Sequence, residues 1–96
     1  MPETRFRKRP VEVSAIQWTG DNETELRDWT EHRFETTAPG DYSDPDITAI
    51  VYDDLHSTWV GVKTGQWIMR GVKDEFYPID EEVLAETYER LEAHDA

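Results

Sequence analysis

Apolar and polar side chains alternate near the start of the chain, between Pro10 and Trp18. Val11, Val13 and Ala15 fall on one side of an extended chain, and polar residues separate them. An alternation with period two is typical of a strand that buries one face. We therefore expect a strand from Pro10 to Trp18.

Further apolar segments lie between residues 47 and 79, separated by turn-forming residues. The segment 47–52 is apolar on both faces of an extended chain, which predicts a strand at the centre of a sheet. The last segment, EFYPI, contains Pro78, which has no N–H to donate, so we expect this strand at a sheet edge. The segments HSTWVGV and QWIMR predict two strands between these, and RFETTA (residues 33–38) predicts a short strand before them.

Two segments have the spacing of amphipathic helices. Residues 23–32 place Leu26 and Trp29 on one side of a short helix. At its start, Asn22 and Glu25 have the spacing of a capping box, in which each side chain would accept a backbone N–H.

The second helix is expected to close the chain, from Glu81 to about Glu92. Leu84, Tyr88 and Leu91 recur at positions i, i+4 and i+7 and give this helix a packing face. The pattern therefore predicts an α+β fold: a mainly antiparallel sheet of about five strands, a short helix after the first strand and a closing C-terminal helix.

A chain of 96 residues is too short for two independent cores, so we expect one domain spanning residues 1–96. A flexible basic arm (residues 1–9) should precede the first strand, and residues 93–96 should fray. A short chain without disulfide or metal gains stability by burying apolar surface against a second copy, so a homodimer is expected.

The formal net charge of −12 is unevenly distributed. The first ten residues carry +3, which leaves −15 on the rest of the chain. So acidic a body repels phosphate backbones and anionic membranes, and direct DNA binding is not expected. Glu82, Glu86 and Glu89 line up on one face of the predicted closing helix. They form either the solvated surface of an acidic protein or an acidic face that mimics nucleic acid.

The residue types needed for catalysis or metal binding are sparse. The chain has no cysteine, and its three histidines do not have the spacing of metal ligands. Ser57 lies beside His56, but neighbouring residues on a strand point to opposite faces and do not pair. We therefore expect no catalytic residue, no metal, no cofactor and no enzymatic activity.

Aromatic residues are the remaining candidates for a functional surface. They lie in neighbouring predicted strands, so some face the core, and the others face solvent or a partner. One interpretation buries all of them. The other is an aromatic patch beside positive charge, which binds a partner chain or stacks on a planar ligand. The candidate binding residues are Trp59, Trp67, Arg70, Lys73, Phe76 and Tyr77.

No apolar run approaches the roughly 18 residues that a membrane helix needs. The N-terminus also lacks the apolar segment of a signal peptide. We therefore expect a cytoplasmic protein that does not enter a membrane.

The chain contains the segments RKRP and QWTGDN near its start, and WI, RGV, EFYP and TYE within GQWIMRGVKDEFYPIDEEVLAETYE (residues 65–89). These segments resemble a family of small uncharacterised proteins encoded by phages and prophages of actinobacteria. The chain departs from the family pattern at two turns. Thr64-Gly65-Gln66 stands in place of Pro-Gly-Asp, and Asp74 stands in place of a glycine. The resemblance implies a phage context.

These observations favour a non-catalytic phage accessory protein that binds a host protein or an anti-phage defence factor in the cytoplasm of the infected cell. Two alternatives remain open. One is a small-molecule binder that sequesters a nucleotide signal, and the other is an acidic nucleic-acid mimic.

Overall fold

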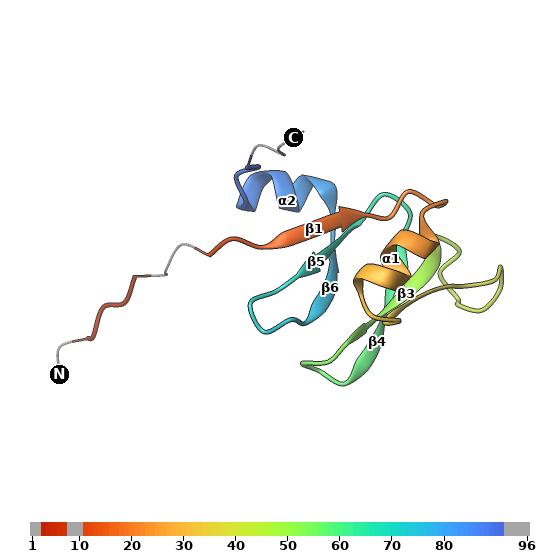
Figure 1. Cartoon of the computed structure of the whole chain (residues 1–96), viewed down its shortest axis with the longest axis horizontal. Coiled ribbons are helices and arrows are strands. Elements are labelled where there is room, and N and C mark those ends of the chain that lie inside the picture. The colour runs from red at the N-terminus through yellow and green to blue at the C-terminus, as the bar shows by residue number, and fades with distance from the viewer. Residues whose placement is uncertain (1–2, 8–10, 92–96) are drawn as a thin grey trace.

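Six strands and two short helices make up the part of the chain that the computed structural model describes, residues 3–7 and 11–91 (Figure 1). Every strand pair is antiparallel. The predicted α+β class and antiparallel pairing are therefore confirmed. The elements are β1 (Ser14–Gln17), α1 (Glu23–Trp29), β2 (Phe34–Thr36), β3 (Ile47–Asp53), β4 (Thr58–Lys63), β5 (Trp67–Arg70), β6 (Phe76–Ile79) and α2 (Glu81–Thr87).

The strands form two sheets of three, in the orders β1-β5-β6 and β2-β3-β4, so the prediction of one sheet of about five strands is wrong. β3 is central in its sheet, and β6 with Pro78 is an edge strand, as the sequence predicts. The sheets separate at the turn after β4, where Gly65 has a φ of 100° and donates its N–H to the Trp18 carbonyl at 2.8 Å. The Trp18 N–H donates in return to the Gln66 carbonyl, so β5 leaves β4 and pairs with β1.

One apolar core lies between the two sheets, because β6 contacts both β3 and β4. Two edge-to-face aromatic pairs lie in this core. The ring centroids of Trp18 and Phe34 are 5.0 Å apart, and those of Trp29 and Phe76 are 5.3 Å apart. The core side chains come from both sheets, from α1 and from the turn after β1; they are Trp18, Leu26, Phe34, Ala49, Val51, Val62, Ile68 and Phe76.

Trp18 also joins the two sheets through a hydrogen bond. Its indole N–H donates to the Thr48 hydroxyl in β3 at 2.9 Å. Thr48 in turn shares a hydrogen bond of 2.8 Å with the Thr64 hydroxyl, next to the β4–β5 turn. Because the indole is 2% exposed, this polar atom needs its partner to offset the cost of burial.

α1 starts at Glu23, as predicted, but the predicted capping box does not form. Asn22 instead accepts the Thr19 N–H at its Oδ1, at 3.0 Å. Its Nδ2 donates to the Gln17 carbonyl at 2.8 Å and to the Glu25 carboxylate at 3.0 Å. The QWTGDN segment therefore folds as a turn stabilised by its own side chains.

α1 ends at Trp29 rather than at the predicted His32. Glu31 and His32 have positive φ angles of 56° and 69°, so the chain cannot continue as a right-handed helix. The buried Thr30 hydroxyl donates to the Leu26 carbonyl at 2.8 Å, beside the Thr30 N–H, which donates to the same oxygen at 3.0 Å. This buried hydroxyl is therefore satisfied.

α2 (Glu81–Thr87) is shorter than the predicted closing helix, whose expected end at Glu92 lies outside the described residues. Tyr88 leaves the helix with an extended backbone, at φ −123° and ψ 142°. The Arg90 guanidinium then lies 5.8 Å from the centre of the Trp67 ring. Contact with β5 therefore accompanies the early end of the helix.

Residues 3–7 have no secondary structure, are exposed, and project away from the sheets (Figure 1). β1 begins at Ser14 rather than at Pro10, which lies outside the described residues. The fraying predicted for residues 93–96 also falls outside the part that the structure describes.

Gly65 and Asp74 provide a test of the turn geometry, since both have left-handed backbones, with φ of 100° and 60°. Among the described residues, no heavy atom outside the adjoining chain lies within 4 Å of a Cβ added at Gly65. We therefore expect Gly65→Ala to lower the free energy of unfolding by about 1–2 kcal/mol through backbone strain alone.

The matched variant Asp74→Gly relieves a strained position instead, and we expect it to raise the free energy of unfolding by up to about 1 kcal/mol. Urea denaturation followed by tryptophan fluorescence measures both variants. A Gly65→Ala protein as stable as the wild type would contradict this account of the turn.

Candidate functional site

The outward face of the β2-β3-β4 sheet is apolar along its central strand. Ala49 and Val51 are buried in the core, so Ile50 and Tyr52 point to the opposite face of the sheet. Both of these side chains are only half-buried. The second apolar side of β3 therefore reaches the surface of the protein.

Trp59 extends this apolar surface onto β4. It lies directly opposite Tyr52 in the strand register. The two rings meet edge to face, with centroids 5.3 Å apart and an interplanar angle of 65°. Trp59 is still 43% exposed. The pair therefore presents a large aromatic surface whose orientation is fixed by a cross-strand contact.

Ile47 joins the same face because of a β-bulge between Ile47 and Ala49. Its Cδ1 atom lies 2.7 Å from the position that a Cβ on Gly61 would take. Gly61 pairs with Ile50 and lies between two inward-facing valines, so the missing side chain leaves room for Ile47 on the outward side. The aromatic face consists of Ile47, Ile50, Tyr52 and Trp59.

Charged residues surround the Tyr52 end of the aromatic face. Arg33 pairs with Asp54 at 2.5 Å and with Glu31 at 3.7 Å. Glu35 lies opposite Ile50 in the register and is exposed. Two carboxylates thus lie beside one arginine, and Glu35 adds a third acidic group on β2, so the local charge is negative.

The β3–β4 turn next to this face is organised by Asp53, which is 6% exposed. Its carboxylate accepts the His56 Nδ1–H at 2.7 Å and the backbone N–H groups of Leu55 and His56 at 2.9 and 3.4 Å. The hydrogen bond from His56 is the main reason why the pKa of Asp53 lies below its usual value, although burial opposes it. Ser57, with a φ of 52°, completes the turn. The Asp53–His56 pair therefore fixes a turn.

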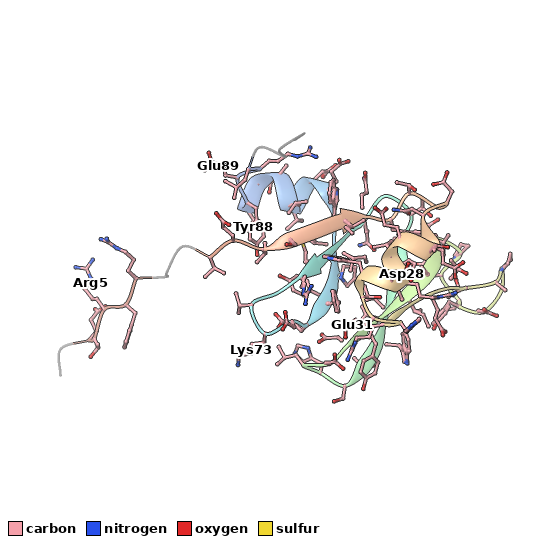
Figure 2. All side chains as sticks on the ribbon, in the orientation of Figure 1. Arg5, Asp28, Glu31, Lys73, Tyr88 and Glu89 are labelled. Atoms are coloured by element: carbon pink, nitrogen blue, oxygen red, sulfur yellow. The ribbon has the colours of Figure 1, made fainter. Side chains whose placement is uncertain are left out.

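The structure distributes the six residues that the sequence singles out over different parts of the protein. Trp59 lies on the aromatic face, whereas Phe76 is 3% exposed and belongs to the core. The Arg70 guanidinium lies 5.8 Å from the centre of the Phe76 ring and bonds to Asp74 at 3.1 Å. Lys73 is exposed at the turn between β5 and β6, as Figure 2 shows.

The two remaining residues, Trp67 and Tyr77, lie on the outward face of the β1-β5-β6 sheet, because Ile68 and Phe76 face the core. They are half-buried, and Met69 between them is fully buried. The Trp67 Nε1 atom is buried and has no hydrogen-bond partner among the described residues. Burial and a side-chain hydrogen bond with Tyr88 raise the pKa of Tyr77 to about 12. Trp67 and Tyr77 therefore contact residues 88–90, the segment that follows α2.

The predicted acidic row is divided by the end of α2. Glu82 and Glu86 are exposed on the helix, but Glu89 follows its last turn. Figure 2 shows Glu89 on the outer side of the protein, while Tyr88 points toward the sheet. The three carboxylates therefore do not share one helical face.

A surface hollow of about 370 Å³ lies beside the start of β3 and the end of β4. Its lining mixes polar and apolar surface and contains no aromatic side chain. In the described part of the chain, no group of three or more His, Asp or Glu side chains is placed to hold a metal ion. None of the helices in that part is long and apolar enough to cross a membrane. The hollow is lined by Pro45, Asp46, Thr48, Lys63 and Thr64.

Three residues of the aromatic face, Ile47, Ile50 and Tyr52, are not among the candidates taken from the sequence. The alternation in β3 already places Ile50 and Tyr52 on the second face of the strand. A strand that is apolar on both faces predicts cover on both sides, so this pattern conceals an exposed face. Ile47 could not be found from alternation at all, because the bulge reverses its direction.

Comparison of the chain with protein-family models, with curated proteins and with solved structures gives no match in any of the three cases.

The Tyr77 hydroxyl gives a test of the contact between the sheet and Tyr88, in the segment that follows α2. The pKa of Tyr77 is raised from 10.0, the value for an unfolded tyrosine, to about 12. The folded protein therefore binds the phenol proton more tightly than the unfolded chain does. The resulting stabilisation is complete below pH 10 and is lost as the pH rises through about 12.

Absorbance at 295 nm, measured against pH, should therefore show one late tyrosine step in the wild type that disappears in Tyr77→Phe. Tyr42→Phe, a substitution of an exposed tyrosine, is the control and should leave the late step in place. Titration of all the tyrosines together near pH 10 would contradict the contact with Tyr88.

Proposed function

We propose that the protein is a non-catalytic phage accessory protein that binds a host protein or an anti-phage defence factor through the aromatic face. The observation that carries this proposal is the Tyr52–Trp59 pair, which stays partly exposed on a sheet whose other side is buried. Aromatic residues are enriched at the centres of protein interfaces, where they contribute a large share of the binding energy.

The position of the pair supports a role in recognition. Tyr52 and Trp59 lie on paired strands rather than on a loop, so little side-chain or backbone freedom is lost when a partner binds. Ile47 and Ile50 extend the apolar surface along the sheet, and contiguous exposed apolar surface is characteristic of interaction sites.

Three features favour a protein partner over a nucleotide. Small-molecule sites are concave and enclose most of the ligand, whereas the aromatic face is the side of a sheet. The hollow at the other end of β3 has no aromatic side chain in its lining on which a base could stack. Glu31, Glu35 and Asp54 also make the surroundings of the pair unfavourable for phosphate groups.

The non-catalytic part of the proposal is supported by the role of the Asp53–His56 pair. The Asp53 carboxylate is occupied by two backbone N–H groups and by His56 Nδ1, which hold the β3–β4 turn in place. The phage context and the site of action in the infected cell follow from the resemblance in the QWTGDN and EFYP segments.

A capture experiment tests this function. The immobilised wild type, Trp59→Thr and Val72→Thr are each exposed to lysate of an actinobacterial host, and retained proteins are quantified by mass spectrometry. Val72 is a matched control because it is 67% exposed and lies on the other sheet's hairpin. We expect Val72→Thr to retain the same host protein in the same amount as the wild type. Trp59→Thr should retain at least about tenfold less of it. Equal retention by all three chains would contradict binding through the aromatic face.

A further inference from the structure

The arm, residues 3–7, combines positive charge with an exposed aromatic ring. Phe6 is 90% exposed and lies between Arg5 and Arg7. Among the described residues, no carboxylate lies within ion-pair distance of either arginine. The arm therefore presents one exposed aromatic ring between two cations, a combination that suits an apolar surface bordered by carboxylates.

The aromatic face has the complementary chemistry. It offers apolar surface at Trp59 and Tyr52, and acidic groups border the Tyr52 end. Arg33 is already paired with both Glu31 and Asp54, while Glu35 has no ion pair among the described residues. A ligand that carries one aromatic ring and two cations therefore complements both the apolar surface and the negative charge of this face.

We propose that the arm of one copy binds the aromatic face of a second copy, and that reciprocal exchange of the two arms forms a twofold dimer. Phe6 packs against Trp59 and Tyr52, and Arg5 and Arg7 lie near the acidic groups on β2 and the neighbouring turns. A closed twofold arrangement uses both arms and both faces, so it does not grow into a filament.

A second copy, rather than the same chain, is the occupant because of where the arm lies. The arm enters the fold through β1, which belongs to the β1-β5-β6 sheet, whereas the aromatic face belongs to the other sheet. Figures 1 and 2 show the arm, with Arg5 labelled, directed away from both sheets. A fully extended chain from Arg5 to Ser14 reaches at most about 30 Å, so the partner's aromatic face must lie within that distance of β1.

Sedimentation equilibrium of the full chain tests this exchange. We expect a concentration-dependent dimer that weakens as salt is added, because charges on the arm and the face are screened. Phe6→Ser should raise the dimer dissociation constant about tenfold or more. Val11→Ser, which removes a 49% exposed apolar side chain nearer to β1, is the matched control and should leave the constant unchanged.

Charge reversal distinguishes arm exchange from any other contact between copies. One variant carries Arg5→Glu and Arg7→Glu, and the other carries Glu31→Lys and Glu35→Lys. Each should be monomeric alone because arm and face then repel each other. An equimolar mixture should dimerise, since each arm then meets a face of opposite charge.

Two results would overturn the exchange. One is a mixture that stays monomeric while both variants keep the wild-type circular dichroism spectrum. The other is a wild type that is monomeric at every concentration, as it would be if the arm folded back on its own chain.

The arm and a host partner bind the same face in these two proposals, so they should compete for it. This competition rests on the proposed function, whereas self-association does not. If both are correct, the Arg5→Glu, Arg7→Glu variant should retain more of the host protein than the wild type, and Trp59→Thr should lose both dimer and partner. Loss of the dimer alone in the arm variant, with unchanged capture, would overturn the competition and leave the proposed function intact.

Discussion

The Trp18 indole is buried between two small sheets and joins them into one fold. Neither three-stranded sheet can bury both of its faces alone, and the chain has no cysteine to hold them together. Trp18 fills the space between the sheets, packs against Phe34 and donates its N–H to Thr48. The two sheets therefore share one core and one buried polar contact.

The shared core determines what the surface can do. Because Ala49, Val51 and Val62 face inward, the alternate side chains of β3 and β4 must face outward. On the other sheet, Tyr88 and Arg90 contact the corresponding face, so Trp67 and Tyr77 are partly covered. Trp59 and Tyr52 stay partly exposed, and the same backbone that stabilises the core holds them in a fixed orientation.

Local patterns in the sequence predict the strands well, since alternation decides where β3, β5 and β6 run and the apolar character of β3 makes it central. Pairing between the strands could not be predicted, because it depends on Gly65 and Gln66 bonding to Trp18, far away in the sequence. The candidate site was predicted only at Trp59. Alternation separates Phe76 from Tyr77, but only the arrangement of the sheets decides which of the two is buried.

We infer that Trp18 makes the two sheets one cooperative unit. Native-state hydrogen exchange on the wild type and Trp18→Phe tests it most directly, because the substitution keeps an aromatic ring and removes the bond to Thr48. We expect the opening free energies of the slowest amides in β3 and in β5 to fall together, by about 1–3 kcal/mol. A fall in only one sheet, with the other unchanged, would contradict it.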